Sequence, residues 1–326
     1  MTIRWGILGT GGIADTFAGD LPFVEGAELA AIGSRRLETA QTFAERHGAA
    51  WAHGSWADLA ADPDVDVIYV ATPHAAHHVA AMTCLEGGKP VLCEKPMTLD
   101  HASAAELVRE ARTRDLFLME AMWMRCNPAI RAVTRAIADG AIGEVTVVTA
   151  DFGVQGPFPP AHRLRDPALG GGALLDLGVY PLNLAHLILG TPASVRSGAH
   201  LTPEGTDQTT GVLLGYESGA VAALTCGING ATENRASITG TEGRIDLPAR
   251  FYVPRSYTIT RAGREPEIVE FPFPGRGYQY EAAEVQRCLA AGLPESPLMP
   301  HRATLEIMTL MDEIRAQIGV VYPAVA

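Results

Sequence analysis

The chain has 326 residues with 25 basic and 37 acidic side chains, so its formal net charge is −12. This charge repels a nucleic-acid backbone or an anionic membrane, and neither is expected as a partner. The composition, 47% hydrophobic and 19% charged, is typical of a globular protein and excludes disordered, collagenous and coiled-coil classes. The length predicts two domains.

The cysteines, the amino terminus and one apolar stretch indicate the cellular compartment of the protein. Five scattered cysteines without a Cys-x-x-Cys pair are typical of a reducing compartment, without a disulfide framework or a zinc site. The amino terminus lacks a signal-peptide pattern. The apolar stretch 172–190 contains Asp176, Asn183 and His186, which a membrane span tolerates poorly. We expect a cytoplasmic protein in which this stretch is a buried helix, and no metal site is implied.

In the first third of the chain, short apolar runs alternate with helical patterns. The runs at 3–8, 28–33, 66–71, 90–93 and 116–119 predict strands, and the patterns at 13–17, 37–46, 75–85 and 100–114 predict helices. Strand–helix alternation with nearly all-apolar strands predicts a parallel sheet covered on both faces. We expect a Rossmann-type, doubly wound α/β domain over residues 1–122.

After residue 122 the pattern changes. A helix at 128–138 and an alternating strand at 144–152 precede a proline-rich loop and the helix that contains Asp176. Further strands are predicted at 209–216, 220–226, 235–238, 257–261 and 268–271, and closing helices at 280–291 and 301–318. Strands without intervening helices are most simply antiparallel neighbours. We expect residues 123–326 to form an α+β domain on a mostly antiparallel open sheet. This domain is expected to bind substrate and to form the oligomer. Its last helix is a candidate to pack on the first domain.

The turn after the first predicted strand reads Gly9-Thr10-Gly11-Gly12-Ile13-Ala14. The first glycine permits a tight turn, the second lets the backbone approach a pyrophosphate, and the small Ala14 lets the helix pack on the strand. An ordinary strand–helix turn can have the same pattern, so the surrounding strand–helix units carry the prediction of a dinucleotide site.

The second strand ends in Ser34-Arg35-Arg36 rather than in an acidic residue. A carboxylate there would bind a ribose 2′-hydroxyl, whereas a hydroxyl and guanidinium groups suit a 2′-phosphate. Glu28 begins the strand and therefore lies at the wrong edge of the sheet. The sequence favours NADP over NAD, with Arg35 as the better phosphate ligand; the alternative is that Arg36 is only a solvated charge.

Two segments follow later strands of the first domain: Thr72-Pro73-His74, with His77 shortly after, and Glu94-Lys95-Pro96. Loops at the carboxyl ends of parallel strands bind ligands in open α/β sheets. Lys95 is therefore predicted to lie beside the nicotinamide, the alternative being a surface lysine before a turn.

In the second domain, Gly170-Gly171-Gly172 begins a helix in which Asp176 and Tyr180 are four residues apart and share one face. Polar side chains on an otherwise apolar helix indicate that this face of the helix lines a binding site. The alternative is a buried structural Asp–Tyr pair.

Together these motifs resemble the Gfo/Idh/MocA family of nicotinamide-dependent oxidoreductases: the glycine turn, Thr72-Pro73 with His77, Glu94-Lys95-Pro96, and Asp176-x-Gly178-x-Tyr180. Most of the family has histidine where Tyr180 stands. The tyrosine is similar to the branch of dimeric dihydrodiol dehydrogenases and NADP-dependent D-xylose dehydrogenases, as are the segments 91–96, 116–123, 171–176 and 296–300. The resemblance implies a Rossmann domain plus an open-sheet domain, and dimer contacts through that sheet. We expect a homodimer.

The residues allow a mechanism for oxidising a secondary alcohol. Tyr180 exchanges the hydroxyl proton, Lys95 favours its phenolate and hydrogen-bonds the substrate oxygen, and Asp176 orients substrate hydroxyls. Predicted to bind the cofactor are Gly9, Thr10, Gly11, Gly12, Ile13, Ser34, Arg35, Arg36, Thr72, Pro73, His74, His77, Glu94 and Lys95. Predicted to bind substrate are Trp123, Arg125, Phe152, Arg163, Asp176 and Tyr180, with Phe158, Arg165 and Tyr278 as further candidates.

The expected function is hydride transfer between NADP and a small polyhydroxylated substrate, either an aldopyranose such as D-xylose or a cyclic trans-dihydrodiol. Three alternatives stay open. They are an oxidoreductase that never releases its nucleotide, a nucleotide-binding sensor on the same fold, and a redox-assisted glycosidase.

Overall fold

The structure is a computed structural model that describes residues 2–323 of the chain. The chain packs into two compact units: Met1–Cys126 together with Pro274–Leu305, and Asn127–Phe273 together with Glu306–Ala326. A segment from far down the chain thus packs with the first unit. The division into a cofactor-binding part at 1–122 and a substrate-binding part at 123–326 concerns function as well as packing, and it stays a prediction.

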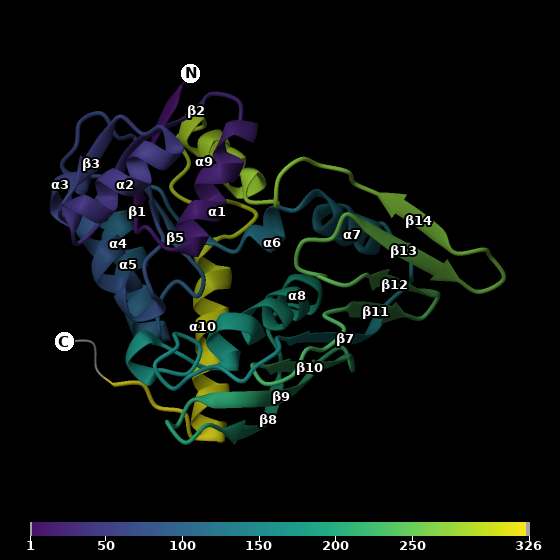
Figure 1. The fold of residues 1–326 in the computed structure, drawn as a ribbon. Coiled ribbons are helices and arrows are strands. Elements are labelled where there is room, and N and C mark those ends of the chain that lie inside the picture. Colours follow the sequence, from purple (N-terminus) through teal and green to yellow (C-terminus); the bar gives the residue numbers. More distant parts are fainter. Residues whose placement is uncertain (1, 324–326) are drawn as a thin grey trace. The chain divides into compact units, whose positions relative to one another are not determined.

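The first unit contains a parallel sheet of strand order β3-β2-β1-β4-β5-β6. Every residue of β4, β5 and β6 is buried, because helices cover both faces of the sheet (Figure 1). The chain order reverses between β1 and β4, and such sheets bind ligands at the carboxyl ends of the strands beside this point. The predicted doubly wound fold is confirmed. The strands are β1 (Ile3–Leu8), β2 (Ala27–Gly33), β3 (Trp51–His53), β4 (Val67–Val70), β5 (Val91–Glu94) and β6 (Leu118–Ala121).

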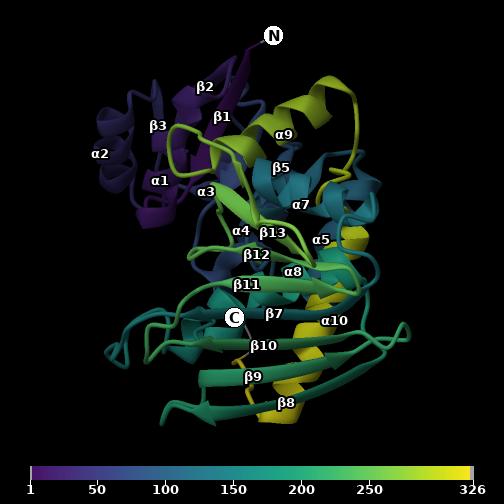
Figure 2. The same ribbon diagram turned by 90° about the vertical axis from the view of Figure 1, so that its right-hand side faces the viewer.

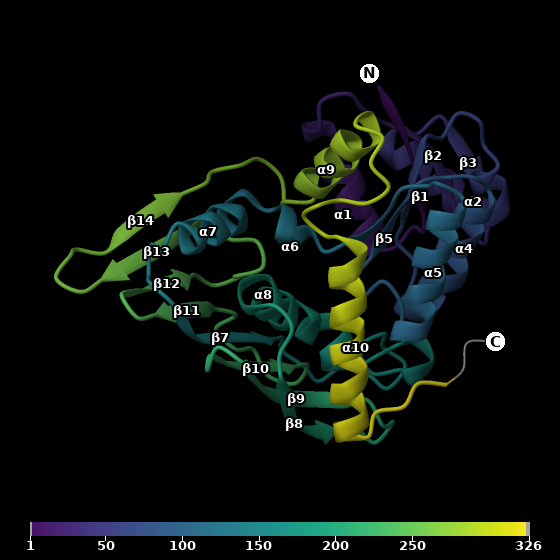
Figure 3. The same ribbon diagram turned by 180° about the vertical axis from the view of Figure 1, so that it is seen from behind.

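Helices of the first unit begin and end at residues that cap them. The Asp100 carboxylate accepts the N–H of Ser103 at the start of α5 (2.8 Å), and Gly48 ends α2 with φ 75°. Figure 3 shows α4 and α5 side by side along the sheet. The helices are α1 (Gly12–Asp20), η1 (Leu21–Phe23), α2 (Leu37–His47), α3 (Trp56–Ala60), η2 (His74–Ala76), α4 (His77–Glu86), α5 (His101–Thr113), α6 (Trp123–Cys126) and α9 (Gln279–Ala290).

Four short elements of this unit, η1, β3, α3 and α6, lie outside the sequence-based prediction. β3 has three residues and its Trp51 is exposed, while α3 has five residues. Elements this short contain too few apolar positions to show a period.

The second unit is built on a sheet of order β14-β13-β12-β11-β7-β10-β9-β8, and its strands from β13 to β8 follow one another in Figure 2. All neighbours are antiparallel except β7 and β10, which are parallel because the chain returns beside β7 only after passing through α8, β8 and β9. The predicted mostly antiparallel α+β fold is confirmed. The strands are β7 (Val145–Gly153), β8 (Ser194–Leu201), β9 (Asp207–Gly215), β10 (Val221–Gly227), β11 (Ala236–Gly240), β12 (Gly243–Leu247), β13 (Ser256–Arg261) and β14 (Glu267–Glu270).

β8 and β12 are also absent from the sequence-based prediction. β8 buries only Val195 and shows no apolar alternation. β12 buries Ile245 and Leu247 in alternation with Arg244 and Asp246, but its five residues begin with a glycine and give too short a pattern to predict a strand. Their strand conformation depends on pairing with β9, β11 and β13.

The single helix predicted after Gly172 is interrupted at its start. Residues Leu174–Gly178 form a π-helical turn, η4, and α8 (Val179–Leu189) continues from it. A Cβ on Gly178 would lie 2.9 Å from Sγ of Cys226 on β10, so a glycine is required where the turn approaches the sheet. π-turns inside helices are frequent at functional sites. The other helices of this unit are α7 (Pro128–Ala138) and η3 (Pro167–Leu169), and α10 (His301–Ile318) begins in the first unit and continues in the second.

By length and composition alone, the helical stretch Pro167–Leu189 could cross a membrane, but 78% of its apolar window is buried inside the structure. Such burial is typical of a core helix, as predicted for this stretch. All five cysteines are buried, and none forms a disulfide among residues 2–323.

Candidate active site

The turn between β1 and α1 is shaped for a close ligand approach. Gly9 has φ +119°, and a Cβ there would lie 2.6 Å from the carbonyl oxygen of Ala71. A Cβ on Gly11 or Gly12 would meet nothing within 4 Å, and Gly11 caps α1 without a side-chain hydrogen bond. The first turn of α1 is thus open above its N–H groups, as pyrophosphate binding requires.

Thr72 supplies a second sign of a missing partner at this edge of the sheet. Thr72 follows β4 and comes directly after Ala71, whose carbonyl Gly9 approaches. The Thr72 Oγ1 is buried without a hydrogen-bond partner among the described residues. Buried hydroxyls are normally hydrogen-bonded. The glycine turn and Thr72 therefore fit a bound dinucleotide, which would use the helix N–H groups and this hydroxyl.

The two arginine side chains that follow β2 have guanidinium groups without an interaction partner among the described residues. Arg35 and Arg36 are exposed, and neither guanidinium group makes a hydrogen bond or ion pair within the described part of the chain. The N–H of Ser34 donates to the His53 carbonyl (3.1 Å), which fixes the backbone before them. Glu28 is exposed at the beginning of β2, at the opposite end of the strand from Arg35.

Glu94 and Lys95 follow β5. The Glu94 carboxylate is buried and accepts both the Tyr69 hydroxyl and the Lys95 N–H (3.2 Å). Burial and the Glu94 charge raise the pKa of Tyr69 well above its usual range, so the proton stays on the tyrosine. Lys95 itself is half-buried, and the Lys95–Pro96 peptide is cis.

His77 joins the two loops that contain the predicted motifs. Its ring is fully buried, with Nδ1 2.8 Å from the Pro96 carbonyl and Nε2 2.8 Å from the Thr72 carbonyl. Burial, with the nearby His74, lowers the pKa of His77 to about 3 despite these carbonyls. The ring is therefore neutral at pH 7 and donates to one carbonyl at a time. This geometry gives His77 a role in holding both loops, and its contact with a cofactor stays a prediction.

Trp123 is buried and stacks on Tyr278 with ring centroids 4.2 Å apart. Both belong to the first unit, and Arg125 on the same short helix is also buried. The stack explains the strong burial of both rings. Substrate contacts of Trp123 and Arg125 remain predictions.

In the second unit, Arg163 and Asp176 are brought together. The guanidinium donates from Nη1 to Oδ1 (3.0 Å) and from Nη2 to Oδ2 (3.3 Å) of Asp176. The Asp176 side chain is 9% exposed and that of Arg163 is 55% exposed. Arg165, in contrast, is engaged by Glu204 and by the Phe158 carbonyl (2.8 Å). Of the two arginines in the loop, Arg163 is the one paired with a predicted site residue.

Tyr180 lies in an aromatic cluster with Phe152 and Tyr252. Ring centroids are 5.5 Å apart for Tyr180 and Phe152, and 5.2 Å apart for Tyr180 and Tyr252. Phe152 and Tyr252 stack at 4.4 Å with their planes 8° apart. Tyr252 is a residue that the sequence analysis missed, because it lies in a loop between β12 and β13 with no motif around it.

Asn183, nearly one turn beyond Tyr180 on α8, is fully buried, and its side chain donates to the Val179 carbonyl one turn earlier (3.0 Å). That bond ties the side chain to its own helix. Phe158 stacks on His162 at 4.6 Å.

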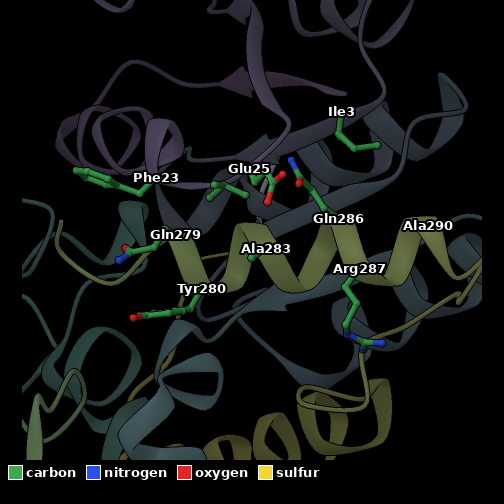
Figure 4. Close-up of a pocket in the computed structure, with 10 residues that line it drawn as sticks. Ile3, Phe23, Glu25, Gln279, Tyr280, Ala283, Gln286, Arg287 and Ala290 are labelled. Atoms are coloured by element: carbon green, nitrogen blue, oxygen red, sulfur yellow. The ribbon is translucent and has the colours of Figure 1, made fainter. Parts of the chain in front are cut away.

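A cavity of about 430 Å³ lies elsewhere in the first unit, along α9 (Figure 4). Ile3, at the first end of β1, lines it together with Phe23, Gln279 and Gln286. Since the glycine turn follows the other end of β1, this cavity is separate from the predicted nucleotide site. None of the predicted site residues lines it.

No group of three or more histidine, cysteine, aspartate or glutamate side chains is arranged to hold a metal ion among residues 2–323. The candidate residues are backbone N–H groups and Lys95 in the first unit, and Asp176 and the phenol of Tyr180 in the second. Groups of these types can bind a dinucleotide and exchange a proton.

Comparison with known proteins agrees with both units. The family model "Oxidoreductase family, NAD-binding Rossmann fold" matches residues 3–122, and "GFO/IDH/MocA C-terminal domain" matches residues 130–246. Trans-1,2-dihydrobenzene-1,2-diol dehydrogenases of Bos taurus and Homo sapiens are 37% and 36% identical to the chain, in each case over 99% of both sequences.

Solved structures give the same result. A 3-ketoreductase from Actinomadura kijaniata, crystallised with NADP and TDP-benzene, is similar with a TM-score of 0.86 and 30% identity, covering 99% of this chain and 100% of that one. An aldose-aldose oxidoreductase from Caulobacter crescentus shares the fold with a TM-score of 0.88, at 24% identity over 97% of each chain. The chain therefore belongs to the Gfo/Idh/MocA family of oxidoreductases and contains that family's NAD(P)-binding Rossmann domain.

Proposed function

We propose that the protein is an NADP-dependent dehydrogenase that acts on a secondary alcohol, or the matching carbonyl, of an aldopyranose or a cyclic trans-dihydrodiol. We choose NADP over NAD because the guanidinium groups of Arg35 and Arg36, after the carboxyl end of β2, have no partner among the described residues. Planar guanidiniums match phosphate oxygens, whereas an NAD site uses a carboxylate at this position. The NADP bound to the related 3-ketoreductase supports the same choice.

A bound nicotinamide supplies hydride transfer. In the proposed mechanism Tyr180 exchanges the proton with the substrate oxygen, and Lys95 stabilises the phenolate, because a nearby cation lowers the pKa of a tyrosine from about 10. Asp176, held by Arg163, accepts hydrogen bonds from substrate hydroxyls.

The related 3-ketoreductase supports this pair of residues. Its solved structures include a variant with tyrosine changed to phenylalanine and variants with one lysine changed to alanine or glutamate. The two positions are separated in that chain by nearly the same number of residues as Lys95 and Tyr180 are here.

The second unit supports a ring-shaped, hydroxylated substrate. The rings of Phe152 and Tyr252 stack beside Tyr180, and a carboxylate stands one turn before it. Apolar faces with a few placed polar groups are typical of sites for small ligands. The relatives named for dihydrodiol dehydrogenation, at 37% identity, favour this class.

The test measures NADPH and NADH formation with D-xylose, D-glucose and a trans-dihydrodiol, with substrate-free reactions as controls. We expect turnover with NADP to exceed that with NAD by at least tenfold for one of these substrates. Binding of NADPH without turnover of any of them would contradict the proposed substrate class. If oxidation occurs only when a second sugar is present as acceptor, the nucleotide is recycled without release.

We also propose a homodimer formed through the outer face of the eight-stranded sheet. Val147, Leu213 and Val221 are exposed there, and Val147 pairs with Val221 across β7 and β10. Exposed apolar sheet faces usually find a partner. Val221→Glu should shift the sedimentation mass from dimer to monomer, whereas Val79→Glu, a similarly exposed valine on α4, should not.

A further inference from the structure

Glu120, the third residue of β6, holds two distant segments of the first unit together. Its side chain is 1% exposed. Oε1 accepts the N–H of Met97 (3.1 Å), and Oε2 accepts the hydroxyl of Thr304 in the first turn of α10 (2.9 Å). The carboxylate thus bridges the chain immediately after Lys95 to a helix more than 180 residues further on.

Three contacts with buried side chains hold the backbone of the loop that contains Lys95. The Lys95 N–H donates to Glu94, the Pro96 carbonyl faces His77, and the Met97 N–H donates to Glu120. Each of these side chains is itself at most 3% exposed. Buried partners of this kind fix a loop because a broken bond would leave a polar group unsatisfied.

The polar groups around Glu120 partly compensate for its burial. Burial is the largest influence on the pKa of its carboxyl group and leaves that pKa above the usual value, although the Thr304 hydroxyl, the Met97 N–H and the charges of Arg125 and Lys95 lower it. Glu120 therefore has two hydrogen-bond donors and two cations to compensate for its burial.

We propose that Glu120 is a positioning residue for Lys95: through its two hydrogen bonds it anchors the Lys95 loop to the start of α10. The proposal rests on the catalytic role proposed for Lys95. The proposal gives a role to Glu120, which lies in the segment 116–123. The sequence analysis used that segment only for the family resemblance and assigned no role to this glutamate. The proposal also gives a reason why the segment that ends at Leu305 packs with the first unit.

Four variants of the full-length protein test this. Glu120→Met removes both acceptors, whereas Glu120→Gln keeps a carbonyl for Met97 and an NH₂ group for the Thr304 oxygen. Thr304→Val removes only the anchor on α10, and Thr304→Ser restores it. Glu284→Met is the matched control, because Glu284 is also a buried carboxylate of this unit, bonded to Arg287 (2.8 Å) and Ser296 but not to the Lys95 loop.

Three readouts are compared: kcat, the Kd of NADPH, and the amide hydrogen-exchange rate of Met97. We expect Glu120→Met to lower kcat by about 10- to 100-fold, since small displacements of catalytic groups have effects of this size. Thr304→Val should lower kcat by about three- to tenfold, Glu120→Gln and Thr304→Ser should stay within about threefold of the unchanged protein, and the Kd should change less than twofold. Met97 exchange should accelerate in Glu120→Met and Thr304→Val.

The proposal is overturned if Met97 exchange is unchanged in Glu120→Met, if Glu120→Gln loses as much activity as Glu120→Met, or if the Glu284→Met control shows the same loss. Thr304→Val keeps the test decisive should Glu120→Met fail to fold. Exchange needs no substrate, so it decides whether Glu120 holds the loop even if the proposed dehydrogenase activity is not found.

Discussion

The loop that contains Lys95 and the loop that contains Arg163 hold their charged side chains in opposite ways. Around Lys95, buried side chains bond the backbone on both sides of the lysine. Arg163 lies in a proline-rich surface loop, is 55% exposed, and is held by its own ion pair with Asp176. Exposed ion pairs contribute little stability, whereas buried networks fix one geometry. The difference indicates a fixed backbone at Lys95 in the first unit and a more adjustable side chain at Arg163 in the second, which suits the substrate contact proposed for it.

The largest effect is expected at the fixed loop. Lys95→Met should lower kcat by about 1,000-fold, because proton-transfer and electrostatic assistance by a positioned group are typically worth this much. Lys95 is also a predicted cofactor contact, so the Kd of NADPH should rise, but by far less than kcat falls, since the glycine turn and Arg35 are untouched. Steady-state kinetics and a nucleotide titration measure both. A loss of nucleotide binding equal to the loss of kcat would make Lys95 a cofactor ligand rather than a catalytic group.

Tyr180 provides the second test, with a control inside its own aromatic cluster. Tyr180→Phe should lower kcat by about 100-fold, because the ring packing is kept while the exchangeable proton is lost. Tyr252→Phe, whose ring lies 5.2 Å from that of Tyr180, should change kcat less than about threefold. The measurement requires conditions in which hydride transfer limits the rate, as shown by a deuterium isotope effect. Equal effects of both variants would show that the cluster acts by packing alone.

Cofactor selectivity should respond less strongly. Arg35→Ala removes an uncommitted guanidinium and should raise the KM for NADP by about tenfold, the value of one charge-assisted hydrogen bond, with little change for NAD. Arg109→Ala, on the exposed face of α5, is the control. If KM rises equally for both nucleotides, Arg35 does not recognise the 2′-phosphate.

The last prediction concerns stability rather than activity, and it tests whether the interior near the Lys95 loop is under electrostatic strain. Glu281 on α9 is fully buried, and neither carboxylate oxygen has a hydrogen-bond partner among the described residues. Burial, together with the charges of Glu94 and Asp20, raises its pKa well above the usual range. Its contribution to stability is therefore fully present below the unfolded pKa of about 4.5 and is lost as the pH rises toward the folded value, by at most about 1.4 kcal/mol per pH unit.

Glu281→Gln removes this titration. Its melting temperature should exceed that of the unchanged protein by a margin that grows between pH 5 and pH 8. Thermal unfolding over this range measures the margin, and Glu284→Gln serves as a control, because hydrogen bonds from Arg287 and Ser296 outweigh burial and lower the pKa of Glu284. A margin that does not depend on pH would show that Glu281 is ionised or paired in the folded protein.

Local signals in the sequence were sufficient for most of the fold. Apolar runs and helical patterns predicted the longer strands and helices of the first unit, and the helix at 301–318 agrees with α10 at both ends. Glycines after β1 and the residues after β2, β4 and β5 could be assigned to one edge because parallel strands all end there. The family resemblance follows from the same motifs, and the family models match both parts of the chain.

Other features depend on contacts between residues far apart in the chain, which no local period contains. The short strand β3 and the strands β8 and β12 form by pairing with their neighbours. Tyr252 enters the cluster of Tyr180 from an unremarkable loop, and Glu120 acquires its role only when Thr304 reaches it from α10. Local motifs are enough to nominate the residues that we propose to bind a dinucleotide and to exchange a proton. Which buried side chains hold the loops around them follows only from the packed chain, because hydrogen bonds across such separations do not exist before the chain has folded.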